Sequence, residues 1–136
     1  MLYSFFHQNQ QFTRSFTKNL NEHLAAVDLY HSQWLVIYYL KQFETSTLVE
    51  ISDYLDVEKP TITRTVNRLE EWELIEKYPS KDKRERRIKL TAKGIKVSEE
   101  ALQIVNSFES ELLEEIPEAD MKTTLRTIQL LKSKLK

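Results

Sequence analysis

The stretch that decides the fold is residues 47–94, which read TLVEISDYLDVEKPTITRTVNRLEEWELIEKYPSKDKRERRIKLTAKG. A helix is predicted to begin at about Pro60, because a proline is tolerated at the first helical position, where its missing N–H has no partner. At 100° per residue, Ile62, Val66 and Leu69 fall within roughly 60° of one another. These three side chains therefore predict the buried side of this helix.

The opposite face of this helix carries polar and cationic side chains that suit the major groove of DNA. In that groove a guanidinium group pairs with guanine and an amide pairs with adenine. A solvated face on an ordinary helix is the alternative interpretation, because charged outward faces are common. The candidate base-contacting residues are Thr61, Thr63, Arg64, Asn67 and Arg68.

A strongly basic hairpin is predicted after this helix. One short strand covers residues 74–79 and a second covers residues 86–90, where Ile88 and Leu90 alternate with cationic side chains. Residues 81–89 hold six basic and two acidic side chains. Such a hairpin can bind phosphates or place an arginine in a narrow minor groove, where the potential is most negative. We expect these contacts from Lys81, Lys83, Arg84 and Arg86.

A shorter helix is predicted to precede the first one. Thr47 and Glu50 form a capping-box pattern at its start, and residues 56–59 form the turn that follows it. A helix, a tight turn, a second helix and a basic hairpin are the layout of a winged helix-turn-helix, in which the first helix crosses the DNA backbone and the second enters the groove. The apolar side of the shorter helix is formed by Leu48, Ile51, Tyr54 and Leu55.

Three motifs occur in this stretch in a fixed order. PTITR at residues 60–64 opens the second helix, DKR at residues 82–84 has the form Asp-x-Arg, and LTAKG at residues 90–94 has the form Leu-Thr-x-x-Gly. In this order and spacing they resemble the winged-helix domain of the MarR family of bacterial transcriptional regulators. The resemblance extends over nearly the whole chain, since Ser32-Gln33-Trp34 and the flanking helices also fit the family layout.

The resemblance implies roles for the wing and for a ligand. It singles out Arg84 as the wing residue that enters the minor groove, with Asp82 orienting it through an ion pair or a turn hydrogen bond. It also implies a small, often aromatic and anionic ligand between the dimer helices and the winged domain. The candidate pocket residues are Phe16, His23, Trp34 and Tyr38, for each of which core packing is the alternative explanation.

One position departs from the family pattern. The family commonly has glycine after the second helix, where this chain has Glu73. A left-handed helix cap at Glu73 would cost roughly 1 kcal/mol more than at glycine. The departure leaves the geometry of this helix end open and leaves the domain unaffected.

Helices are also predicted on both sides of the winged region, which we place at residues 32–91. Residues 1–27 repeat phenylalanine and leucine at helical spacing. A second helix follows at about residues 32–43. After the wing, Thr91 caps a helix that extends to about Ile116, and Pro117 separates it from a last helix. Residues 1–27 and 92–136 suggest a shared dimerisation region, whereas packing within one chain as a closed monomeric bundle is the alternative.

Charge and composition narrow the class of protein further. Net charge is -1, but residues 59–93 hold 11 basic and 6 acidic side chains, so the basic groups are gathered on the winged part. The chain has no cysteine, which excludes disulfides and thiol-based sensing. No apolar run has the length of a membrane span and no secretory signal opens the chain, so we expect a cytoplasmic protein without a membrane partner.

Enzyme and metal functions are not indicated. The three histidines, His7, His23 and His31, do not pair at the i, i+4 spacing that binds a metal on a helix. No nucleophile motif is present, so we expect no catalytic residue, no metal and no cofactor.

Together these features predict a mainly α (α+β) winged helix-turn-helix with a small β-hairpin wing, flanked by dimerisation helices. The expected function is that of a homodimeric, sequence-specific regulator, a repressor, that binds double-stranded DNA at an inverted repeat with half-sites about 10 base pairs apart. The alternative is a winged-helix module that binds an acidic protein partner through its wing.

Overall fold

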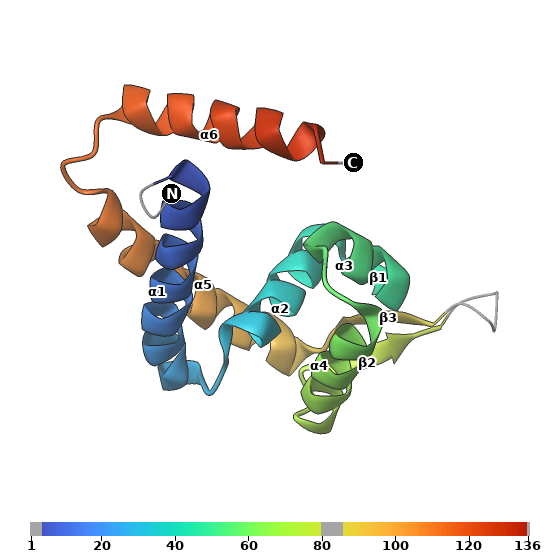
Figure 1. The fold of residues 1–136 in the computed structure, drawn as a ribbon. Helices are drawn as coiled ribbons and strands as arrows, with labels where there is room; N and C mark the ends of the chain where they lie inside the picture. The colour runs from blue at the N-terminus through green and yellow to red at the C-terminus, as the bar shows by residue number, and fades with distance from the viewer. Residues whose placement is uncertain (1–3, 80–85, 136) are drawn as a thin grey trace. The chain divides into compact units, whose positions relative to one another are not determined.

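A computed structural model of the protein describes residues 4–79 and 86–135 (Figure 1). The chain divides into two compact units, Met1–Asn106 and Ser107–Lys136. The described residues are mainly helical, as the sequence predicts. The helices are α1 (Phe5–Leu24), the 3-10 helix η1 (Ala25–Val27), α2 (His31–Phe43), α3 (Leu48–Leu55), α4 (Lys59–Glu71), α5 (Ala92–Leu113) and α6 (Glu118–Ser133).

A small antiparallel sheet lies in the first unit. Its strands are β1 (Thr45–Thr47), β2 (Ile75–Tyr78) and β3 (Arg87–Leu90), and β3 lies between the other two. The strands β2 and β3 form the predicted wing hairpin, with Ile75 opposite Leu90. The strand β1 was not predicted. It pairs with β3 so that Ser46 lies opposite Ile88, and both of these residues are fully buried.

The two helices of the predicted helix-turn-helix follow β1. The capping box at the start of α3 is confirmed, because the Glu50 amide donates to Thr47 Oγ1 at 3.1 Å and the Thr47 amide donates to Glu50 Oε1 at 3.1 Å. Asp56 ends α3 in a left-handed conformation, with φ of 54°. The helix α4 begins at Lys59, so Pro60 occupies the second helical position and the turn is one residue shorter than predicted.

The buried side of α4 is the one that the sequence predicts. Ile62 is 3 % exposed, and Val66 and Leu69 are fully buried. This stripe packs against α2 and α3, where Ile37 and Ile51 are also fully buried. Burying an aliphatic side chain of this size stabilises a fold by about 1.5–3 kcal/mol. The packing therefore fixes which face of α4 points away from the core.

The end of α4 is joined to the start of α5 by close backbone contacts. Glu73 has φ of 60°, so this chain keeps a left-handed helix end without glycine. The Thr91 hydroxyl donates to the Glu73 carbonyl at 2.6 Å and accepts from the Gly94 amide at 2.9 Å, which confirms Thr91 as the cap of α5. A Cβ atom at Gly94 would lie 2.1 Å from the Leu74 carbonyl oxygen. The only glycine of the chain therefore allows a close approach of two backbones.

Several predicted helix boundaries were wrong. The first helix was predicted to run through residue 27, but α1 ends at Leu24 and a 3-10 turn follows; residues 1–3 lie outside the described residues. The helix after the wing ends at Leu113 rather than at about residue 116. Its end is set by the chain reversal at Glu115, which has φ of 68° ahead of Pro117. None of the described helices is long and apolar enough to cross a membrane.

Candidate nucleic-acid interface

The outward face of α4 presents the predicted base-contacting residues. Arg64, Asn67 and Arg68 are exposed, whereas Thr61 and Thr63 are half-buried at the edges of this face. The hydroxyl of Thr63 donates a hydrogen bond to the Lys59 carbonyl at 3.0 Å, so this group lies against the helix backbone. The exposed side chains supply guanidinium donors and an amide, which are the groups that read base edges in the major groove.

Two of these side chains are oriented by neighbours on α4 or at its C-cap. Arg64 Nη2 donates to Thr61 Oγ1 at 3.2 Å. The Arg68 guanidinium carbon lies 5.9 Å from the centre of the Trp72 ring, which is within the range of a cation–π contact. These contacts already restrict the rotamers of both arginines in the free protein. Fewer rotamers are therefore lost when the face binds a ligand. The face is therefore partly ordered before any ligand arrives.

Arg86 connects the base of the wing to α4. Its Nη2 atom lies 2.6 Å from Glu70 Oε1 and 3.5 Å from Asn67 Oδ1. Three other wing residues were predicted to contact DNA, and Asp82 was predicted to orient one of them. All four lie outside the described residues: Lys81, Asp82, Lys83 and Arg84. Among the wing residues predicted to contact DNA, Arg86 is thus the one that the described residues include, and it lies against Glu70 and Asn67 of α4.

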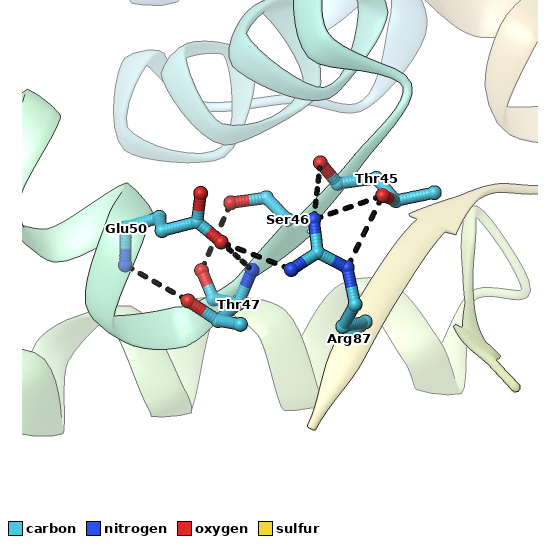
Figure 2. Close-up of polar contacts among 5 residues, drawn as sticks. All are labelled: Thr45, Ser46, Thr47, Glu50 and Arg87. Carbon is cyan, nitrogen blue, oxygen red and sulfur yellow. Dashed lines mark hydrogen bonds and ion pairs between the residues drawn. The ribbon is translucent and has the colours of Figure 1, made fainter. Parts of the chain in front are cut away.

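A second arginine ties the wing to the start of α3 (Figure 2). Arg87 Nη1 lies 3.3 Å from Glu50 Oε1, and its Nε and Nη2 atoms donate to Thr45 Oγ1 at 3.3 and 3.0 Å. The same Glu50 oxygen accepts the Thr47 amide of the capping box. This cluster was not predicted from the sequence. The pairing of Thr47 with Arg87 across β1 and β3 would have indicated the cluster. That pairing can be predicted only after β1 has been recognised as a strand.

The Glu50 carboxylate is stabilised in its charged form by this cluster. The Thr47 amide hydrogen bond is the main cause that holds the pKa of Glu50 below its ordinary value near 4.5, and the Thr47 hydroxyl and Arg87 act in the same direction, against the opposing effect of burial. A carboxyl whose pKa is lower in the folded state stabilises the fold above its unfolded pKa. This stabilisation is lost as pH falls through the folded value.

We expect Glu50→Gln to flatten the acid dependence of folding stability. At neutral pH the variant should be slightly less stable than the wild type, because it lacks the charge that accepts the Thr47 amide hydrogen bond and faces Arg87. As pH falls below about 4.5, the wild type should lose this advantage and the two stabilities should converge. Urea unfolding followed by circular dichroism across this range measures the difference. Parallel stability curves for the two proteins would contradict the assignment.

The four candidate ligand residues fall into two groups. Trp34 and Tyr38 form an edge-to-face pair on α2, with ring centres 5.4 Å apart; Trp34 is buried and Tyr38 is exposed. On α1, Phe16 is half-buried with its ring 6.0 Å from that of Phe12, and His23 Nδ1 lies 2.9 Å from the Asn19 carbonyl oxygen. Cavities of about 480 and 400 Å³ in the described part of the first unit are lined by other residues.

The chain is similar to known transcriptional regulators. The model of the MarR family matches residues 29–86. The HTH-type transcriptional regulator YwoH of Bacillus subtilis, itself uncharacterized, is 41 % identical over 114 residues, which cover 84 % of this chain and 83 % of that protein.

Two solved structures share the fold over nearly their whole length. The C80S mutant of Escherichia coli MarR, complexed with operator DNA, is 28 % identical with a TM-score of 0.80, and the match covers 95 % of this chain and 91 % of that one. Staphylococcus aureus MarR, in complex with salicylate and kanamycin, is 28 % identical with a TM-score of 0.85, covering 96 % and 89 %. The likeness therefore includes the winged region and the flanking helices.

Proposed function

This chain belongs to the MarR family of transcriptional regulators, and from that premise we propose that it binds double-stranded DNA sequence-specifically as a homodimeric repressor in the cytoplasm. The observation that carries the proposal is the outward face of α4. There Arg64, Asn67 and Arg68 are exposed opposite a buried apolar stripe. The match to an operator-bound MarR supports the same use of this face.

In the proposed complex, α4 enters the major groove and the wing follows the neighbouring backbone. The α4 contacts come from Thr61, Thr63, Arg64, Asn67 and Arg68. From the wing, Lys81 and Lys83 contact phosphates and Arg84 enters the minor groove, oriented by Asp82. This division assigns sequence reading to α4 and mainly non-specific affinity to the wing. Binding DNA in this way requires no catalytic residue.

Exposed apolar side chains on the terminal helices support a homodimer. On α1, Phe6 and Phe12 are each 60 % exposed, and on α6, Leu125 and Leu130 are 52 % and 60 % exposed. On each of these helices, large apolar side chains with this exposure favour burial against a partner. We assign residues 1–27 and 92–136 to the dimerisation region. Two-fold symmetry then predicts an inverted repeat with half-sites about 10 base pairs apart.

Selection of randomised duplexes by the purified protein tests this function. We expect enrichment of an inverted repeat whose half-sites lie one helical turn apart. Fluorescence anisotropy on the enriched duplex should give a steep, linear fall of log affinity with log salt, because each phosphate contact releases counterions. No enrichment, together with a shallow salt dependence, would contradict the proposal. It would favour a winged-helix module that binds an acidic protein.

We further propose regulation by a small aromatic or anionic ligand near Phe16, His23, Trp34 and Tyr38. The salicylate complex of the Staphylococcus aureus relative supports this class of ligand. To release DNA, the ligand must favour a spacing of the two α4 helices that no longer matches the groove repeat. Salicylate is a suitable probe in the same anisotropy assay. Operator affinity that never responds to it would count against salicylate-like ligands.

A further inference from the structure

Arg86 was expected to contact DNA, but its surroundings support a different role. We propose that Arg86 is a positioning residue that fixes the amide of Asn67 for base reading, and that Glu70 holds Arg86 in this place. The inference rests on the proposed DNA-binding function and deepens it. It assigns part of the sequence specificity to an ion pair that itself touches no base.

The ion pair lies beside the reading face of α4. Asn67 and Glu70 are three residues apart and therefore neighbours on the helix surface. The Nη2 atom of Arg86 lies 2.6 Å from Glu70 Oε1, a short charge-assisted hydrogen bond, and 3.5 Å from Asn67 Oδ1. The Glu70 side chain is only 24 % exposed, against 40 % for Arg86. Arg86 thus links the two α4 side chains through one nitrogen atom.

This arrangement orients the Asn67 amide. A guanidinium group carries only donors, so it attracts Oδ1 and repels the Nδ2 amino group. The amino group is then directed away from Arg86, and the outward part of Asn67 acts as a donor. Guanine presents two acceptors, N7 and O6, in the major groove, whereas adenine presents one acceptor and one donor. Asn67 held in this way should favour guanine over adenine.

The same ion pair alters how Arg86 interacts with phosphates. A free arginine at the base of the wing would bind a phosphate and release a counterion, which adds about 0.9 to the salt slope for each phosphate contact. Glu70 provides a carboxylate in place of that phosphate. Arg86 should therefore contribute little to the salt dependence of binding, unlike the other cationic residues of the wing.

The test compares three variants on the enriched operator and on duplexes altered at the base that Asn67 contacts. In Arg86→Ala, we expect guanine-over-adenine discrimination at that base to fall about tenfold, while the salt slope stays unchanged. In Arg86→Lys, a cation remains beside Oδ1 and should restore most of the discrimination. In Glu70→Gln, release of Arg86 should steepen the salt slope by about 0.9 and raise affinity for unrelated duplexes.

A matched control is Lys89→Ala on β3, the strand that directly follows Arg86. Lys89 is also ion-paired, with its Nζ atom 3.5 Å from Glu76 Oε1, and the variant should leave base discrimination unchanged. The inference is overturned if Arg86→Ala makes the salt slope shallower by about 0.9 and leaves base preference intact, because Arg86 would then be a phosphate contact. Failure of the proposed function is a separate result, in which the wild-type protein enriches no duplex.

Discussion

Arg64→Ala is expected to weaken binding to the best operator by about 1–3 kcal/mol and to remove the preference at a single base position. Arg64 is exposed on α4, and Thr61 Oγ1 accepts a hydrogen bond from its Nη2 atom. An arginine oriented in this way can donate two parallel hydrogen bonds to N7 and O6 of guanine. Loss of these bonds affects the duplexes that carry the matching base and spares the others.

Anisotropy titrations with a panel of single-base operator variants measure this effect. Lys81→Ala is the matched control, because a wing lysine that binds phosphate should weaken every duplex by the same factor and make the salt slope shallower by about 1. The two variants thus separate base reading from backbone binding. If Arg64→Ala left the ranking of operator variants unchanged, the role assigned to Arg64 would be wrong.

Gly94→Ala is expected to destabilise the protein by about 1–3 kcal/mol or more. The new Cβ atom would lie 2.1 Å from the Leu74 carbonyl oxygen and 3.0 Å from its carbonyl carbon. These are backbone atoms, and the same carbonyl accepts a hydrogen bond from the Thr91 amide at 3.1 Å. The start of α5 would have to move away from β2 to relieve the contact.

Helix propensity alone predicts that Gly94→Ala raises the free energy of unfolding. The experiment therefore distinguishes helix propensity from the backbone clash. In an open helix, alanine is more favourable than glycine by about 1 kcal/mol. Free energies of unfolding from urea titrations should therefore fall for Gly94→Ala and remain within about 0.5 kcal/mol of the wild type for the exposed control Lys96→Ala. A Gly94→Ala protein as stable as the wild type would show that α5 can shift without loss.

Local features of the fold followed from the sequence because their causes lie within a few residues. The capping box needs only Thr47 and Glu50, and the buried stripe of α4 needs only a period of 3.6 residues. The strand β1 escaped prediction because three residues are too few to show alternation. It exists through pairing with β3, which lies about forty residues later.

The candidate site also combines local features that the sequence predicts with long-range contacts that it does not predict. Exposure of Arg64, Asn67 and Arg68 could be predicted from helical geometry, since each lies opposite the apolar stripe. The contact of Arg86 with Glu70 could not, because 16 residues separate them and their distance depends on how the wing packs against α4. The cluster of Arg87 with Glu50 depends on the register of β1 against β3 for the same reason.

Thr91 links the end of α4 directly to the start of α5. Its hydroxyl group donates a hydrogen bond of 2.6 Å to the Glu73 carbonyl, just after α4. The same hydroxyl accepts a hydrogen bond of 2.9 Å from the Gly94 amide in α5. The backbones of Gly94 and Leu74 lie so close that a Cβ atom at Gly94 would be 2.1 Å from the Leu74 carbonyl oxygen. We therefore expect a rotation at the start of α5 either to move the end of α4 with it or to break both hydrogen bonds. We expect a rotation at the start of α5 to change the orientation of α4 through these contacts.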